Sequence, residues 1–330
     1  MNILITGAAG FIGNRLARKI LESGNLAGRR VERLVLLDQF APADDLRRDA
    51  RVECRTGPLL DQCAALRDET YDGIFHLASA VSGECELDFE LGLRSNLDST
   101  RALLEAVRAS TARGHPPTRF VFASSSAVFG ADEGHEMPQV VTDETLPAPQ
   151  TSYGTHKLMC EYLLADYTRK GFIDGRSARL VTVTVRPGKP NGAASSFFSS
   201  IIREPLAGRP AVCPVSPDVA HPVSSPGKTV EGLIRVFECG REQLGGRLAL
   251  NFPALNVRVG EMLEALEKVA GRPVRSLVRF EHDERIAKIV AGWPMALTAE
   301  RAKRIGLEPA TSFEAIVREY VAEFHPELAK

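Results

Sequence analysis

The sequence predicts an α/β fold, a doubly wound parallel sheet followed by a smaller and mostly helical part. Three observations lead to this prediction. Short apolar stretches alternate with amphipathic helical stretches through the first half of the chain. The apolar stretches lack the polar alternation of a half-exposed strand, as is typical of strands buried on both faces of a sheet. A glycine-rich turn joins the first of these strands to the first helix.

The elements of the predicted sheet follow one another along the chain. Strands are expected at residues 3–6, 34–38, 52–54, 73–76, 119–123 and 180–185, the last being rich in β-branched residues. The helices between them are expected at residues 11–23, 89–109 and 153–167, and Gly24 marks the end of the first one. Strands that alternate with helices in this order predict the doubly wound arrangement.

The composition changes after residue 185, where Pro and Ser become frequent as far as Pro226. Further elements are expected at residues 196–206, 228–239, 248–251 and 312–324. We therefore expect residues 1–187 to form a dinucleotide-binding domain, to which residues 227–251 return. Residues 188–226 and 252–330 are expected to form a substrate-binding cap.

The overall charge and cysteine pattern exclude several classes of function. Lys plus Arg number 41 and Asp plus Glu 42, a balance that argues against partners such as nucleic acids or anionic membranes. Nothing in the chain resembles a targeting segment or a bilayer-spanning run, so a cytoplasmic protein is expected. The 6 cysteines form no C-x-x-C pair. We expect buried free thiols and no metal site.

The glycine turn predicts a bound dinucleotide. Gly7, Gly10 and Gly13 form a G-x-x-G-x-x-G pattern between the first strand and the first helix. The first glycines allow backbone to approach a pyrophosphate, and the last lets helix and strand pack closely; the helix N-terminus then faces the phosphates. Asp38 ends the second strand, where a carboxylate binds the adenosine ribose hydroxyls and repels a 2′-phosphate. This predicts a Rossmann-type domain that binds NAD.

A Y-x-x-x-K motif begins the helix expected at residues 153–167. Tyr153 and Lys157 are four residues apart and so share a face of that helix. A lysine ammonium beside a phenol and an oxidised nicotinamide both favour the phenolate, so such a tyrosine can act as a base near neutral pH. Lys157 is also expected to hold the nicotinamide ribose. His156 points to another face and has no expected chemical role.

Two segments at strand ends complete the predicted site. Ser124, Ser125 and Ser126 leave the fifth strand, where a serine hydroxyl can hydrogen-bond the reacting oxygen. His76 closes the fourth strand and is followed by the small residues 77–79, which would fit close to the cofactor. A histidine within an apolar strand is more often structural than basic, and we interpret His76 as structural.

Together these segments resemble the extended short-chain dehydrogenase/reductase family of NAD-dependent epimerases and dehydratases, along the whole chain. The resemblance implies that Ser125 is the catalytic serine beside Tyr153 and Lys157, and that Ser126 contacts substrate. The family usually has Gly-Asp after the third strand. Here Gly57-Pro58 stands instead, with Asp61 as a possible substitute. An Asp-Val pair of the family is also absent, and residues 221–226 occupy that region.

The resemblance also implies a full set of binding residues. Cofactor contacts are expected from Gly7, Gly10, Phe11, Ile12, Gly13, Asp38, Asp61, Leu77, Ala78, Ser79, Asn96, Ser124, Tyr153, Lys157 and Pro187. Substrate contacts are expected from Ser125, Ser126, Tyr153, Lys189 and Asn191, the last two as donors to a carboxylate. Arg186, at a strand end, is a weaker candidate because it can simply brace the sheet.

Segments 186–191, 193–197 and 201–206 resemble a narrower group of the family. Its members oxidise the C2 hydroxyl of a four-carbon sugar acid to a 2-keto acid by hydride transfer to NAD. Two alternatives are a nucleotide-sugar epimerase or other sugar dehydrogenase, and a non-enzymatic NAD(P) sensor. Sensors typically lose the tyrosine or the lysine, and both are present. A small sugar acid is thus the expected partner, and the resemblance implies a homodimer.

Overall fold

The computed structural model describes residues 1–188 and 194–328. It divides into two compact units. The first comprises residues 1–128, 151–180 and 230–250, and the second comprises residues 129–150, 181–229 and 251–330. The assignment of cofactor binding to one part of the chain and substrate binding to the other stays a prediction.

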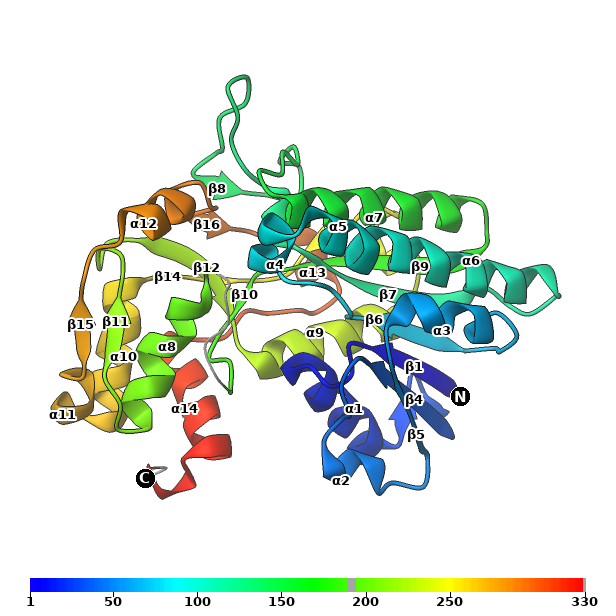
Figure 1. Cartoon of the computed structure of the whole chain (residues 1–330), viewed down its shortest axis with the longest axis horizontal. Helices are drawn as coiled ribbons and strands as arrows, with labels where there is room; N and C mark the ends of the chain where they lie inside the picture. The colour runs from blue at the N-terminus through cyan, green and yellow to red at the C-terminus, as the bar shows by residue number, and fades with distance from the viewer. Residues whose placement is uncertain (189–193, 329–330) are drawn as a thin grey trace. The chain divides into compact units, whose positions relative to one another are not determined.

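The first unit is built on a seven-stranded sheet in the order β13-β9-β7-β6-β1-β4-β5 (Figure 1). Its strands are β1 (Asn2–Thr6), β4 (Arg33–Asp38), β5 (Val52–Thr56), β6 (Gly73–His76), β7 (Thr118–Ser125), β9 (Ile173–Leu180) and β13 (Leu250–Asn251). Every pairing from β9 to β5 is parallel. The chain winds outward from β1 to β5, then returns to β6 and winds the other way, which confirms the doubly wound fold.

Helices cover the sheet on both faces (Figure 1). The principal ones are α1 (Phe11–Ser23), α3 (Leu59–Leu66), α6 (Ser99–Ala112), α7 (Ser152–Arg169) and α9 (Pro226–Glu238). The apolar side chains of α3, α6 and α7 pack in one core with alternate residues of β1, β4, β6 and β7. Smaller elements of this unit are β2 (Asn25–Leu26), β3 (Arg29–Arg30), α2 (Asp44–Arg47), α4 (Ser82–Leu87), η2 (Ser126–Val128) and η3 (Glu242–Leu244).

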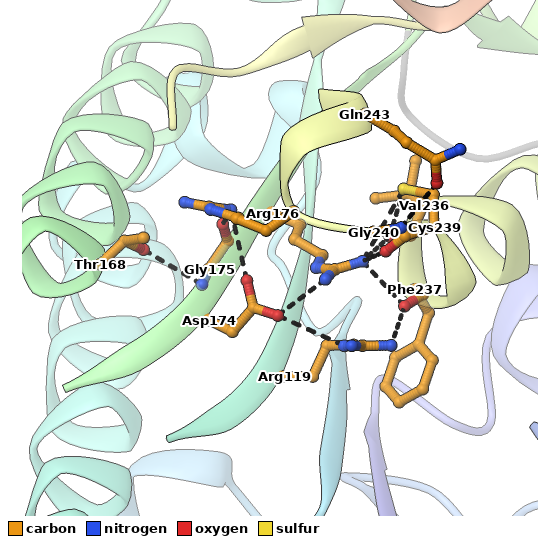
Figure 2. A network of polar contacts seen from close by, with 11 residues as sticks. Arg119, Thr168, Asp174, Gly175, Arg176, Val236, Phe237, Cys239, Gly240 and Gln243 are labelled. Carbon is orange, nitrogen blue, oxygen red and sulfur yellow. Dashed lines mark hydrogen bonds and ion pairs between the residues drawn. The ribbon is translucent and has the colours of Figure 1, made fainter. Parts of the chain in front are cut away.

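A buried arginine holds the end of α9 against the sheet (Figure 2). The side chain of Arg176 is fully buried, and its Nη1 donates to the carbonyl oxygens of Val236, Phe237 and Cys239 at 2.6, 2.8 and 2.7 Å. Its Nη2 donates to Asp174 at 2.7 Å. The last carbonyls of a helix have no intrahelical donor, so Arg176 satisfies them and its charge favours the negative end of the helix.

The second unit has its own core. A three-stranded sheet, β10 (Thr182–Val183), β12 (Ala220–Ser224) and β14 (Leu255–Arg258), lies with α8 (Ser196–Leu206), α10 (Val259–Ala270) and α14 (Phe313–Phe324), which supply most of the buried apolar side chains. Its smaller elements are β8 (Val140–Val141), β11 (Ala211–Cys213), β15 (Val278–Phe280), β16 (Ala296–Leu297), α11 (Arg272–Arg275), α12 (Glu284–Ala291), α13 (Glu300–Arg304) and η4 (Pro326–Leu328).

The predicted sixth strand is wrong in position. The sequence favoured residues 180–185, whereas the sheet is continued by β9 at Ile173–Leu180, and Thr182–Val183 belong to another sheet. Asp174, Arg176 and Arg179 give β9 the appearance of a surface segment. Their charges are paired inside the fold, so the strand can be buried.

Two further expectations need correction. The helix predicted at residues 89–109 is α5 (Phe89–Gly92), a π-helical segment η1 (Leu93–Asp98) and then α6. All six cysteines are free, and five are buried as expected. Cys54 is exposed, because β5 is the edge strand of the sheet.

Candidate active site

The glycine turn between β1 and α1 is closely packed from two sides. Gly7 has φ +73°, and a Cβ there would lie 2.6 Å from the backbone nitrogen of Ala78. A Cβ on Gly13 would collide with the carbonyl oxygen of Gly7 and the backbone of Ala8. Only glycine therefore fits at both positions, which confirms the close packing of helix and strand that the motif predicts. Phe11 and Ile12 form the first turn of α1, where backbone N–H groups have no intrahelical acceptor.

Asp38 ends β4 beside this turn. Its carboxylate accepts hydrogen bonds from the backbone N–H of Ala9 at 2.9 Å and of Phe40 at 3.1 Å. The side chain is thus oriented by the glycine turn itself, and each oxygen keeps a second lone pair for another donor. This arrangement suits the predicted contact with ribose hydroxyls.

His76 is enclosed in a chain of hydrogen bonds. Its Nδ1 lies 2.6 Å from the Thr6 hydroxyl and its Nε2 lies 2.8 Å from the Thr100 hydroxyl. Thr100 donates to the carbonyl of Asn96, so it must accept from Nε2–H, and Nδ1 then accepts from Thr6. Burial, with a smaller contribution from Lys157, lowers the pKa of His76 to about 3. Burial and the two threonine partners favour a neutral ring that holds the strand end in place, in agreement with the predicted structural role.

Asn96 holds the segment that follows His76. Its Oδ1 accepts from the backbone N–H of Ala80 at 2.7 Å and from the Ser79 hydroxyl at 3.1 Å. Asn96 is 3% exposed and lies in the π-helical segment η1. Its side chain also donates to the carbonyl of Ala80 and to Cys85 Sγ, so Asn96 fixes the conformation of the segment predicted to contact the cofactor.

Tyr153 and Lys157 share one face of α7, as the motif predicts. Tyr153 lies in the first turn, which Thr151 caps by accepting from the N–H of Gly154 at 3.0 Å. Lys157 is 3% exposed. Its Nζ donates to the carbonyl of Ala123 at 2.8 Å and lies 5.5 Å from the centroid of the Tyr153 ring. An ammonium is thus fixed beside the phenol.

The three serines at the end of β7 have different surroundings. The hydroxyl of Ser124 is buried and donates to Glu161 at 2.5 Å. The Oγ of Ser125 is half-buried and accepts from the N–H of Ala127 at 3.1 Å, which leaves its own proton available for another bond. Ser126 is half-buried and begins η2.

Sequence reasoning missed Glu161 and Arg179. Glu161 lies one helical turn after Lys157 on the same face of α7 and forms a buried ion pair with Arg179 of β9, with Arg179 Nη2 2.7 Å from Oε2. The available signal was the spacing, because Glu161 follows Lys157 by four residues and so shares the face of the Y-x-x-x-K motif. Its partner Arg179 could not be predicted, because the strand was expected at residues 180–185 and Arg179 therefore lay outside it.

The remaining predicted residues lie in different elements of the two units. Asp61 is exposed near the start of α3, and Pro187 follows β10 in the second unit. Arg186 donates to the carbonyl of Val183 at 2.8 Å and to Ser195 at 3.3 Å, in keeping with the bracing role considered for it. Lys189 and Asn191 lie outside the described residues.

Within residues 1–188 and 194–328, no cluster of His, Cys, Asp or Glu could hold a metal ion. None of the helices in the described part of the chain is long and apolar enough to cross a membrane.

Comparisons with known proteins extend these observations. Residues 3–218 match the family described as NAD dependent epimerase/dehydratase. A D-erythronate dehydrogenase of Cupriavidus necator is 48% identical, over 98% of this chain and 98% of that protein. A D-erythronate dehydrogenase of Haemophilus influenzae is 40% identical, over 97% and 99%. A crystal structure of a nucleoside-diphosphate-sugar epimerase from Agrobacterium tumefaciens superposes with a TM-score of 0.93 and 42% identity, covering 100% of this chain and 96% of that one.

Proposed function

The chain belongs to the NAD dependent epimerase/dehydratase family, and we propose that within it the chain oxidises the C2 hydroxyl of D-erythronate to give 2-dehydro-D-erythronate. It is an NAD-dependent oxidoreductase, and NAD is its cofactor. The observation that carries the proposal is the 48% identity to a D-erythronate dehydrogenase over 98% of both chains.

The residues of the first unit suit NAD binding. The turn at Gly7 and Gly13 leaves no room for side chains, and the first turn of α1 supplies N–H groups for phosphate oxygens. Asp38 would accept from the adenosine ribose hydroxyls. Ser79 would border the cofactor, with Asn96 holding its segment in place. When bound, NAD supplies the acceptor for the hydride that leaves C2 of the substrate.

Three side chains of this unit would handle the proton. Ser125 would donate to the oxygen on C2 and hold it, since its Oγ is already oriented by Ala127. Tyr153, as phenolate, would accept the proton of the C2 hydroxyl as the carbonyl forms. Lys157, held by the carbonyl of Ala123, would stabilise the negative charge on the tyrosine oxygen before that transfer. Ser126 is proposed as a further substrate contact.

The substrate carboxylate requires donors, because an unpaired buried carboxylate is costly. We propose Lys189 and Asn191 as these donors. For the oligomeric state we propose a homodimer. The exposed apolar side chains of Leu87, Phe89, Met159 and Tyr162 lie on α4, α5 and α7, which pack on one another, and offer a surface for a second copy. Light scattering of the purified protein tests this proposal.

A nucleotide-sugar epimerase is the second candidate function. The likeness to the Agrobacterium tumefaciens structure, at 42% identity and a TM-score of 0.93, favours it. Such an enzyme would keep NAD bound and release no NADH, whereas a dehydrogenase releases NADH at each turnover. The two functions therefore differ in a directly measurable product.

A panel of four- to six-carbon sugar acids, with NAD and the absorbance of NADH as readout, tests the proposal. We expect D-erythronate to give the highest kcat/KM of the panel. UDP-sugars are tested in parallel for epimerised product. Conversion of a UDP-sugar without NADH release, together with no activity on any sugar acid, would establish the epimerase instead.

A further inference from the structure

Three polar side chains follow one another at intervals of four residues along α7. Tyr153, Lys157 and Glu161 lie on one face of the helix, which is the face toward the sheet. Lys157 is 3% exposed and Glu161 is 4% exposed. Lys157 and Glu161 are thus buried charged side chains on the helix that carries the proposed base, and the proposed proton-transfer chemistry uses only Lys157.

Glu161 is bound from two adjacent strands. The hydroxyl of Ser124 in β7 donates to its Oε1 at 2.5 Å. Arg179 in β9 donates in a bidentate manner, from Nε to Oε1 at 2.9 Å and from Nη2 to Oε2 at 2.7 Å. Ser124 and Arg179 are direct neighbours in the parallel pairing of β7 with β9. The carboxylate therefore ties α7 to both strands at one level of the sheet.

This level adjoins the proposed catalytic residues. Three consecutive residues of β7 are involved. Ala123 accepts from Lys157, and Ser124 donates to Glu161. The next residue, Ser125, carries the proposed catalytic hydroxyl. The helix is thus pinned at two successive turns to two successive residues of one strand. Any slide of α7 along the sheet would move Tyr153 relative to Ser125.

Stability alone explains this pair poorly. Burying two charges costs free energy, and apolar residues of similar volume are often neutral or stabilising in place of a buried ion pair. A bidentate pair does supply fixed geometry, because both side chains are held in one orientation. Proton transfer needs such geometry, since a misplacement of about 1 Å can reduce a rate by roughly 100-fold.

We propose that Glu161 is a positioning residue, which with Arg179 and Ser124 fixes α7 so that Tyr153 and Lys157 face Ser125. The inference rests on the proposed dehydrogenase function. Glu161 touches neither substrate nor cofactor in this proposal, and it acts through Lys157 and the backbone of β7.

The test replaces the pair by apolar residues of similar size, Glu161→Met with Arg179→Met. We expect the double variant to stay folded, with a midpoint of thermal unfolding within a few degrees of the unmutated protein. We expect kcat on D-erythronate to fall at least tenfold, with KM changed less than threefold. The dissociation constant of NADH, measured by fluorescence, is expected to rise at least threefold, because Lys157 is expected to hold the nicotinamide ribose.

Two further variants separate positioning from general damage. Arg179→Lys keeps the charge beside Glu161 and loses the bidentate contact, so its kcat should lie between those of the unmutated protein and the double variant. Arg33→Met with Glu53→Met removes an ion pair between β4 and β5 at the other end of the sheet, and it should leave kcat and NADH affinity unchanged. Equal losses in this control, or a folded Glu161→Met/Arg179→Met variant with normal kcat and NADH affinity, would overturn the proposal. NADH affinity needs no sugar acid, so it tests the positioning role even if D-erythronate is not the substrate.

Discussion

The ammonium of Lys157 donates a 2.8 Å hydrogen bond to the carbonyl oxygen of Ala123, and this bond joins α7 to the strand that ends in Ser125. Two aromatic rings also lie close to this ammonium. Its Nζ is 4.8 Å from the centroid of Phe122 and 5.5 Å from that of Tyr153. A buried cation needs such partners. The bond therefore holds a positive charge in one place beside the tyrosine.

Tyr153→Phe should abolish most of the turnover, because the ring stays while the proton acceptor is lost. General-base catalysis is worth ~10²–10⁴-fold, and we expect kcat to fall by at least that order with NADH binding retained. Tyr162→Phe is the matched control, since Tyr162 is exposed on the same helix and should give normal kinetics. Near-normal turnover of Tyr153→Phe would mean that another group is the base.

Asp38→Ser should narrow the preference for NAD over NADP. The carboxylate is oriented by the N–H groups of Ala9 and Phe40, and its charge would face the 2′-phosphate of NADP. The ratio of kcat/KM for the two cofactors is the measurement. If the unmutated protein had the same kcat/KM with NAD and with NADP, the role assigned to Asp38 would be wrong.

Lys189→Ala tests the proposed carboxylate contact. We expect KM for D-erythronate to rise tenfold or more with NADH affinity unchanged, which corresponds to ~1.4 kcal/mol. Lys288→Ala, at an exposed position of α12, should leave both values unchanged. An unaltered KM in Lys189→Ala would move the carboxylate site to Asn191 or another donor.

Local patterns predicted the parts of the fold that local forces determine. The first helix runs from Phe11 to Ser23 as expected, because its apolar positions repeat at helical spacing and Gly24 adopts a left-handed conformation at its end. The fourth strand also has the predicted bounds, residues 73–76. The glycine turn and the shared face of Tyr153 and Lys157 follow from short spacings in the same way.

Long-range pairing determined what could not be predicted. Strand β9 contains Arg176 and Arg179, whose charges can be buried because the carbonyls at the end of α9 and Glu161 of α7 supply their partners. Arg176 finds its acceptors 60 to 63 residues away, and Glu161 meets Arg179 across 18 residues. A hydropathy pattern over a short stretch of sequence shows that a residue is charged. It does not show which distant residue neutralises that charge in the fold.

Arg176→Met should be strongly destabilising. It would leave the carbonyls of Val236, Phe237 and Cys239 without their buried donor, and Asp174 would lose one of its cationic partners (Figure 2). Removing one partner from such a network costs about 3 kcal/mol or more, measurable by urea unfolding. Arg169→Met, in an exposed pair with Asp166, should cost less than about 0.5 kcal/mol. A cost below about 1 kcal/mol for Arg176→Met would contradict this view of the network.

Stability should fall as the pH is lowered from 7.5 to 5.5, because of His76 and His221. Burial is the main cause that lowers the pKa of each to about 3, from an unfolded value of 6.5. In this window the unfolded chain binds protons that the native rings do not, so the free energy of unfolding rises with pH and levels off above 6.5. At pH 5.5 each buried histidine should lower the free energy of unfolding by roughly 1.4 kcal/mol, compared with its value at high pH.

Urea unfolding at the two pH values measures this dependence, and His76→Gln isolates the share of one ring. That variant should show a smaller loss between pH 7.5 and 5.5, by roughly 1.4 kcal/mol, whatever its absolute stability. His282→Gln, at an exposed position, should keep the pH dependence of the unmutated protein. The comparison of slopes is needed because His76→Gln also removes the hydrogen bonds with Thr6 and Thr100, which lowers stability at every pH. An unchanged slope in His76→Gln would show that the ring is protonated in the native state and that burial does not keep it neutral.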